Sequence, residues 1–115
     1  MKQLFVYKAK VIKVIDGDTI DFTVDLGFNA YQAIRTRLLG INAPELSTME
    51  GKTTKIFVQR LLPVGSEVII ETYKTPSDKY GRWLAIVHMY TEDAGVMHNL
   101  NQLLITEGYA LEFMT

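Results

Sequence analysis

Residues 19–26 alternate apolar and polar side chains more regularly than any other part of the sequence. Ile20, Phe22, Val24 and Leu26 fall on one face, and the threonine or aspartate before each of them falls on the other. A period of two is typical of a β-strand with one buried face. The chain is therefore expected to build a sheet that hides one of its sides.

Further strands are predicted on both sides of this segment. The residues between the first two strands, Asp16-Gly17-Asp18, are a hairpin signal, because glycine tolerates a positive φ and aspartate bonds back to the turn backbone. The additional strands are predicted over residues 5–15, 31–39, 68–70 and 83–87, with a polar loop over residues 74–82.

Two helices are predicted between and after these strands. Ser47 and Glu50 have the spacing of a capping box, in which each side chain satisfies a backbone donor at the start of a helix. The apolar residues that follow at helical spacing are Ile56, Phe57, Leu61 and Leu62, and Pro63 and Gly65 end the element. A second helix is predicted over residues 99–107, with Gly108 in the position after its C-cap.

The order of elements indicates the fold class. Three strands, a helix, two strands and a helix in 115 residues predict one domain over residues 1–115, mainly β with helices (α+β). Five short strands in a chain of this length favour a small barrel, because closure removes exposed edges. A parallel α/β fold would require strands and helices to alternate.

Composition excludes several kinds of site. The chain has no cysteine, so disulfides, thiolate metal ligands and cysteine nucleophiles are impossible, and His88 and His98 lack the further ligands that a zinc site needs. The net charge of -1 does not indicate a broad surface for polyanions, so nucleic acid would have to bind locally.

Lys8, Lys10 and Lys13 interrupt the first apolar run, and no transmembrane segment is found. We expect a cytoplasmic protein without membrane partners.

Carboxylates and guanidinium groups gather in three short segments, residues 16–19, 35–45 and 78–82. Taken singly, these segments are explained as a turn, a loop before a helix and a solvated hairpin tip. Together they are complementary, because Asp18 and Glu45 can hold a hard cation or activate water, while Arg37 and Arg82 can each grip two phosphate oxygens. Phosphodiester cleavage needs both kinds of group.

In these motifs the sequence resembles the staphylococcal nuclease (thermonuclease) family. The matching pieces occur in family order at residues 14–20 (VIDGDTI), 37–45 (RLLGINAPE), 78–82 (DKYGR), 100–104 (LNQLL) and 107–110 (EGYA). The resemblance implies an OB-fold, which is a five-stranded Greek-key barrel, here with two or three helices. It also implies a calcium-dependent endonuclease that acts on DNA, RNA or both.

The resemblance implies a role for each matching residue. Asp18 is similar to the carboxylate that ligates Ca²⁺, and Glu45 to the residue that activates or orients the attacking water. Arg37 and Arg82 are similar to the two arginines that grip the scissile phosphate. The remaining positions implied by the resemblance are Ala43, with a backbone carbonyl for the metal, and Lys79 and Tyr80, with contacts to a second, terminal phosphate.

The sequence departs from the family pattern in two places. Asn42 replaces a second metal-binding carboxylate, and although its amide oxygen can still coordinate calcium, the lost charge predicts weaker metal binding. Only residues 111–115 remain where a third helix is expected. Phe113 could replace the aromatic residue that stacks on the base, although a role in the core is favoured.

Two functions are left open by these departures. The favoured one is an active nuclease, with activity reduced by Asn42. The alternative is a catalytically weak or inactive OB-fold module that binds single-stranded nucleic acid or a protein partner. We expect a monomer or a weak homodimer, in which a partner chain could cover the face that the missing helix leaves exposed.

Overall fold

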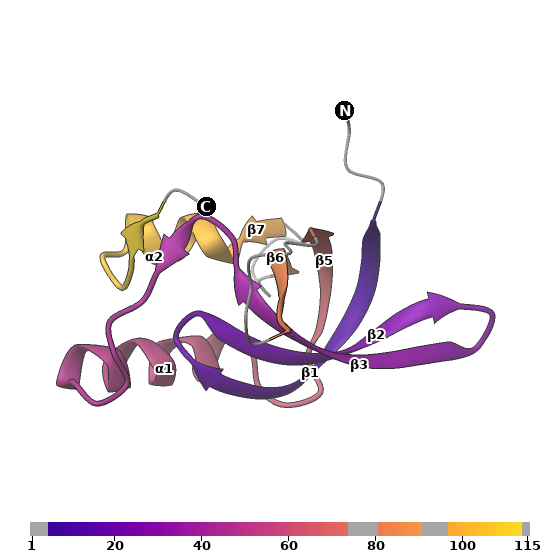
Figure 1. Cartoon of the computed structure of the whole chain (residues 1–115), viewed down its shortest axis with the longest axis horizontal. Helices are drawn as coiled ribbons and strands as arrows, with labels where there is room; N and C mark the ends of the chain where they lie inside the picture. The colour runs from indigo at the N-terminus through magenta and orange to yellow at the C-terminus, as the bar shows by residue number, and fades with distance from the viewer. Residues whose placement is uncertain (1–4, 74–80, 91–96, 114–115) are drawn as a thin grey trace.

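The structure is a computed structural model that describes residues 5–73, 81–90 and 97–113 (Figure 1). Its elements are, in chain order, β1 (Val6–Asp16), β2 (Thr19–Gly27), β3 (Ala30–Leu38), β4 (Ile41–Asn42), α1 (Met49–Leu61), β5 (Glu67–Tyr73), β6 (Trp83–Tyr90), β7 (Met97–Asn99), α2 (Leu100–Thr106) and β8 (Leu111–Glu112). No helix in the described ranges is long and apolar enough to cross a membrane.

Five of the strands close into a barrel within the described residues. The order β3-β2-β1-β5-β6 is antiparallel throughout, and a short parallel pairing of β3 with β6 closes the ring. That pairing runs from Thr36 opposite Trp83 to Leu38 opposite Ala85. The predicted α+β fold with an OB-type five-stranded barrel is thereby confirmed.

The core lies inside this barrel and confirms the alternation of β2. Ile20, Phe22 and Val24 are buried, whereas Leu26 is 42% exposed because the end of β2 belongs to a hairpin that projects away from the barrel (Figure 1). The described helices contribute to the same core through residues such as Val58 of α1 and Leu104 of α2. Burial of this apolar surface is what drives the barrel to close.

Helix α1 begins one residue later than predicted. Thr48, not Ser47, is the N-cap, and its side-chain oxygen accepts a hydrogen bond from the Gly51 N–H at 3.0 Å. Its buried face also differs, since Gly51 and Thr54 are buried while Ile56 is 49% exposed. Small residues take this face because α1 packs closely against neighbouring backbone.

The segment after α2 is extended in the described residues. Gly108 has a φ of 79° and ends α2 as predicted. The chain then forms β8, which pairs with β4 through Ile41 opposite Glu112 and Asn42 opposite Leu111. Residues 111–112, where the resemblance implies the start of a third helix, therefore form a two-residue strand that is tied to β4.

Candidate active site

The candidate site lies on the side of the barrel where β2 begins and β3 ends. Thr19 and Arg37 are opposite each other in the β2–β3 ladder, and Arg37 is also opposite Leu84 in the parallel β3–β6 ladder. These pairings place the turn before β2, the end of β3 and the start of β6 side by side. Three segments that are distant in sequence therefore meet at one place.

Asp18 is the most enclosed acid of the site, with 13% of its side chain exposed. Its Oδ2 accepts a hydrogen bond from the Ala43 N–H at 3.1 Å, and its Oδ1 accepts one from the Thr19 hydroxyl at 3.4 Å. Burial raises the pKa of Asp18, and neighbouring Asp16 adds to this, while the Ala43 amide and Arg37 oppose it. A cation near this carboxylate would relieve the cost of its buried charge.

Arg37 is held in a fixed orientation by backbone carbonyls. Its Nη1 donates to the carbonyls of Leu38 at 3.0 Å and Ile41 at 2.9 Å. Its Nη2 donates to Asn42 Oδ1 at 3.2 Å and lies 3.8 Å from Asp18 Oδ2. The guanidinium group is therefore pre-oriented beside the Asp18 carboxylate, where a phosphate could approach it.

Arg82 reaches the same place from the start of β6. Its Nη1 donates to the Thr19 hydroxyl at 3.3 Å, and the same hydroxyl donates to Asp18 Oδ1. Thr19 is buried, with 4% of its surface exposed. It thus links the second arginine to the acid. The structure therefore brings together five of the predicted site residues, Asp18, Arg37, Asn42, Ala43 and Arg82.

Glu45 is close in the chain, but its carboxylate does not join these contacts. The residue is exposed, and within the described part of the chain no hydrogen bond or ion pair joins its side chain to the other site residues. Its backbone is fixed, because its carbonyl accepts hydrogen bonds from the N–H of Thr48 at 2.9 Å and from the Thr48 hydroxyl at 2.6 Å. Lys79 and Tyr80 lie outside the described residues.

Two glycines that support the site have a role that the sequence analysis missed. A Cβ on Gly17 would meet Thr54 Cγ2 at 2.5 Å, and a Cβ on Gly51 would meet the Glu45 carbonyl oxygen at 1.9 Å. Gly17 does not have a positive φ, so the interpretation that the hairpin turn needs glycine here for its backbone conformation is wrong. Both glycines instead permit the Asp18 turn and the Glu45 loop to pack directly on α1.

Phe113 lies at the site and not in the core, contrary to the favoured expectation. It is 47% exposed, and the Arg37 Cζ lies 5.6 Å from the centre of its ring. Its N–H donates to the Gly40 carbonyl at 2.9 Å, next to the β4–β8 pairing. A two-residue bridge has no periodicity that the sequence could reveal. The only sequence indication was that Phe113 lies near the position of the aromatic residue that stacks on the base in the family.

The side-chain oxygen atoms of the site are of the kind that hard cations prefer, but few of them carry charge. Asp18 Oδ2 and Asn42 Oδ1 both face the positively charged Arg37 Nη2, so the two side chains can direct oxygens at one positive centre. Across the described residues, however, no three His, Asp or Glu side chains gather to hold a metal ion. One carboxylate and one amide oxygen suit Ca²⁺ or Mg²⁺ in kind, but together they carry little charge.

The fold and the site together define an OB-type barrel that carries a cluster of carboxylate and arginine groups on its side. A family model described as "Staphylococcal nuclease homologue" matches residues 35–115, and the chain belongs to that family.

Curated relatives agree with this membership. The chain is 31% identical over 107 residues to "Micrococcal nuclease" of Shigella flexneri, covering 90% of this chain and 57% of the relative. It is 31% identical over 106 residues to "Protein ParB" of Escherichia coli, covering 90% of this chain and 55% of that protein. An uncharacterized protein of Methanocaldococcus jannaschii is 26% identical over 132 residues, which cover 95% of this chain and 60% of the relative. The chain thus spans little more than half the length of these relatives.

Proposed function

We propose that this chain is a metal-dependent nuclease domain over residues 1–115 that hydrolyses phosphodiester bonds of DNA, RNA or both, with Ca²⁺ as its metal. The observation that carries the proposal is that two arginines converge on Asp18: Arg37 lies 3.8 Å from its carboxylate, and Arg82 is linked to it through the buried Thr19 hydroxyl. Membership of the nuclease family and similarity to the Shigella nuclease support it.

In this proposal Asp18, Asn42 and the carbonyl of Ala43 hold the metal. Bound Ca²⁺ would neutralise charge on a non-bridging phosphate oxygen and make a nearby water easier to deprotonate. Asp18 presents its carboxylate to the site, and its hydrogen bond from Ala43 keeps the carboxylate in place. The hydrogen bond thus fixes Asp18 and Ala43 relative to each other as two parts of the proposed metal site.

The two arginines bind and stabilise the phosphate. Arg37 and Arg82 place positive charge where the equatorial oxygens gain negative charge in the pentacovalent transition state. Backbone carbonyls already orient Arg37, so little reorganisation is needed when substrate arrives. Glu45 accepts a proton from the attacking water, and Lys79 and Tyr80 contact a terminal phosphate of the substrate.

A second candidate function is a catalytically weak or inactive module that binds single-stranded nucleic acid or a protein partner. The observation that favours it is that Asn42 Oδ1 accepts a hydrogen bond from Arg37, while the Glu45 carboxylate makes no contact with the other site residues in the described ranges. Such a module would retain nucleic acid without cleaving it, and its binding would weaken as salt is raised.

Incubation of purified protein with single-stranded DNA distinguishes the two functions. We expect cleavage in calcium that excess chelator abolishes, and Arg82→Ala and Glu45→Gln are each expected to lose about a hundredfold to a thousandfold in rate. Arg60→Ala, which removes an exposed arginine from the last turn of α1, is the matched control and should cleave normally. Binding without cleavage would favour the module, and full activity in either site variant would remove its assigned role.

A further inference from the structure

The first half of β3 has an unpaired edge. β2 pairs with β3 on one side along nearly all of its length, but β6 pairs with the other side only at residues 36–38. Within the described residues, residues 30–35 therefore have no strand on that side, and Figure 1 shows the β2–β3 hairpin projecting from the barrel. A free strand edge presents N–H and C=O groups that can pair with another chain.

The tip of this hairpin carries an apolar residue in an unfavourable position. Phe28 is fully exposed and has a φ of 57°, a conformation that bulky side chains rarely adopt. Asparagine or glycine would suit the turn better and would expose no apolar surface. Folding of the monomer therefore does not account for this side chain, whereas contact with another molecule would.

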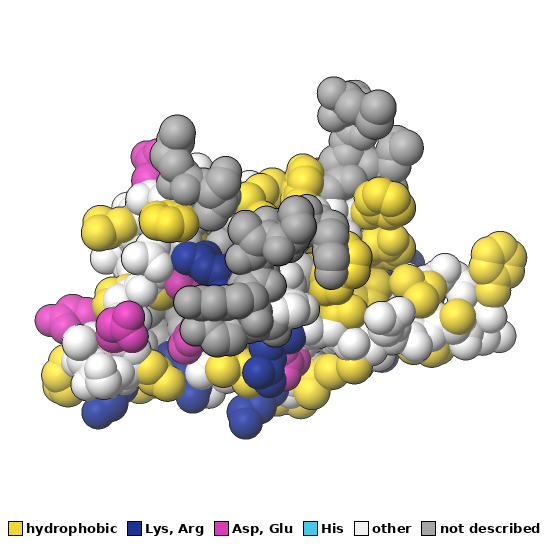
Figure 2. Space-filling view, in the orientation of Figure 1, with side chains coloured by type: hydrophobic (Ala, Val, Ile, Leu, Met, Phe, Trp, Pro, Cys, Tyr) yellow, Lys and Arg dark blue, Asp and Glu magenta, His cyan; other side chains and the backbone are white. Residues whose placement is uncertain are grey.

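An apolar cavity of about 410 Å³ lies beside the same edge. Its lining includes Phe5, Leu26, Gln32, Ile34 and Trp83, and none of the described residues that line it is charged. Figure 2 shows hydrophobic side chains spread over this end of the molecule. The absence of cations among these residues disfavours a nucleic acid here, because polyanions are bound largely through Lys and Arg.

We propose that the occupant of this surface is a second copy of the chain, paired β3 to β3 across a two-fold axis. The surface is self-complementary, because Phe28 of each chain can contact the apolar cavity of the other, and the two unpaired β3 edges can pair with each other. Self-complementarity is what a two-fold interface between identical chains requires, because one patch serves both subunits. The proposal concerns oligomeric state and does not depend on nuclease activity.

The pairing register follows from the geometry of the sheet. When a sheet continues across a two-fold axis, the two copies of β3 are antiparallel, and residues directly opposite each other share a face of the sheet. One residue must therefore lie opposite its own copy, with the axis midway between the two. Pairing must end before Thr36, which already pairs with Trp83. An axis at Gln32 pairs residues 30–34 of the two chains. Phe28 then lies just beyond the end of this pairing, next to the cavity residue Trp83 of the partner subunit.

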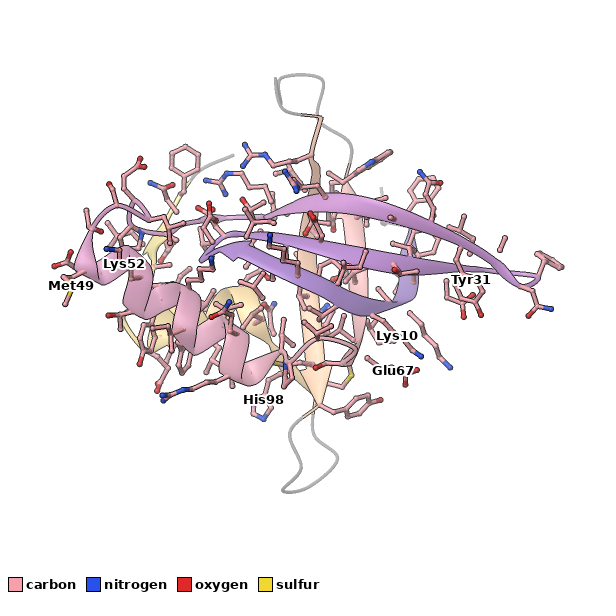
Figure 3. All side chains as sticks on the ribbon, turned by 90° about the horizontal axis from the view of Figure 1, so that it is seen from below. Lys10, Tyr31, Met49, Lys52, Glu67 and His98 are labelled. Atoms are coloured by element: carbon pink, nitrogen blue, oxygen red, sulfur yellow. The ribbon has the colours of Figure 1, made fainter. Side chains whose placement is uncertain are left out.

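Analytical ultracentrifugation over a range of concentrations tests the interface. We expect a concentration-dependent dimer in the unmodified chain and a dissociation constant raised about tenfold or more in Phe28→Asn, which suits the turn but removes the apolar contact. Gln32→Lys should weaken the dimer as well, because it places like charges opposite each other. Met49→Gln is the control, since Met49 is 75% exposed and Figure 3 shows it at the opposite end of the molecule from Tyr31.

A cysteine cross-link tests the register separately. The chain has no cysteine, so Gln32→Cys introduces a single thiol, and its copy in the partner subunit would lie about 4.5–5.5 Å away between Cβ atoms. Oxidation should give a covalent dimer from Gln32→Cys and much less from Ala30→Cys. Three results would overturn the proposal. The first is a chain that stays monomeric at every concentration, and the second is a dimer that neither Phe28→Asn nor Gln32→Lys weakens. The third is equal cross-linking of Gln32→Cys and Ala30→Cys.

Discussion

Substitution of Gly51 by alanine should disturb the site through the Glu45 loop. The added Cβ would lie 1.9 Å from the Glu45 carbonyl oxygen, whereas real Cβ atoms essentially never come closer than 3.0 Å to another atom. The loop must therefore move by roughly 1 Å, and a misplacement of this size can cost about a hundredfold in rate. We expect kcat/KM of Gly51→Ala on single-stranded DNA to fall by about that factor.

The stability of the same variant gives a second, independent measurement. Forcing an atom into a packed contact costs about 1–3 kcal/mol, while alanine favours the helix over glycine by about 1 kcal/mol. The net loss of up to about 2 kcal/mol corresponds to a Tm lower by up to roughly 8 °C for a chain of this size. Lys52→Ala, at an exposed position in the same turn of α1, is the control (Figure 3). If Gly51→Ala matched Lys52→Ala in both Tm and kcat/KM, the proposed coupling of α1 to Glu45 would be wrong.

Three further predictions concern the residues around Arg37. Burial raises the pKa of Asp18 in the folded chain above its ordinary 3.8, so ionisation of Asp18 disfavours folding as pH rises. Without metal, Asp18→Asn should therefore have a higher Tm than the unmodified chain at pH 7, and calorimetry should show this difference shrinking as pH falls through the raised pKa and vanishing below 3.8. Asn42→Asp adds a carboxylate and should tighten Ca²⁺ binding about tenfold by titration calorimetry, whereas unchanged affinity would place residue 42 outside the metal shell. Phe113→Leu removes the ring beside Arg37 and should lower unfolding free energy by about 0.5–1 kcal/mol in urea, a loss that Phe113→Tyr should avoid.

The part of the fold that the sequence predicts well is the part with a regular pattern. The alternation around Phe22 predicts β2 and its buried face, because a period of two is a local property of the chain. The β3–β6 closure and the β4–β8 bridge were not predictable in this way, since each joins a few residues that are distant in sequence. Phe113 illustrates the consequence, because its place beside Arg37 depends on the β4–β8 bridge.

The candidate site was predicted as a set of chemical groups, but not as a set of contacts. Asp18, Arg37 and Arg82 were recognisable from their chemistry and their motifs. The residue that joins them, Thr19, was assigned only to the polar face of a strand, because a buried hydroxyl has no distinctive sequence signal. Gly17 was assigned to a turn conformation when its actual role is close packing on α1.

Arg37 has a structural task that must be separated from its proposed chemical one. Its Nη1 satisfies the carbonyls of Leu38 and Ile41, so Arg37→Ala leaves two acceptors without that donor and should cost about 1–3 kcal/mol of stability. A loss of cleavage in that variant would therefore not by itself demonstrate phosphate binding. Glu45→Gln is the sharper test, because the structural contacts of Glu45 are made by its backbone carbonyl, which glutamine keeps. An unchanged Tm with lost cleavage in Glu45→Gln would assign the loss to chemistry.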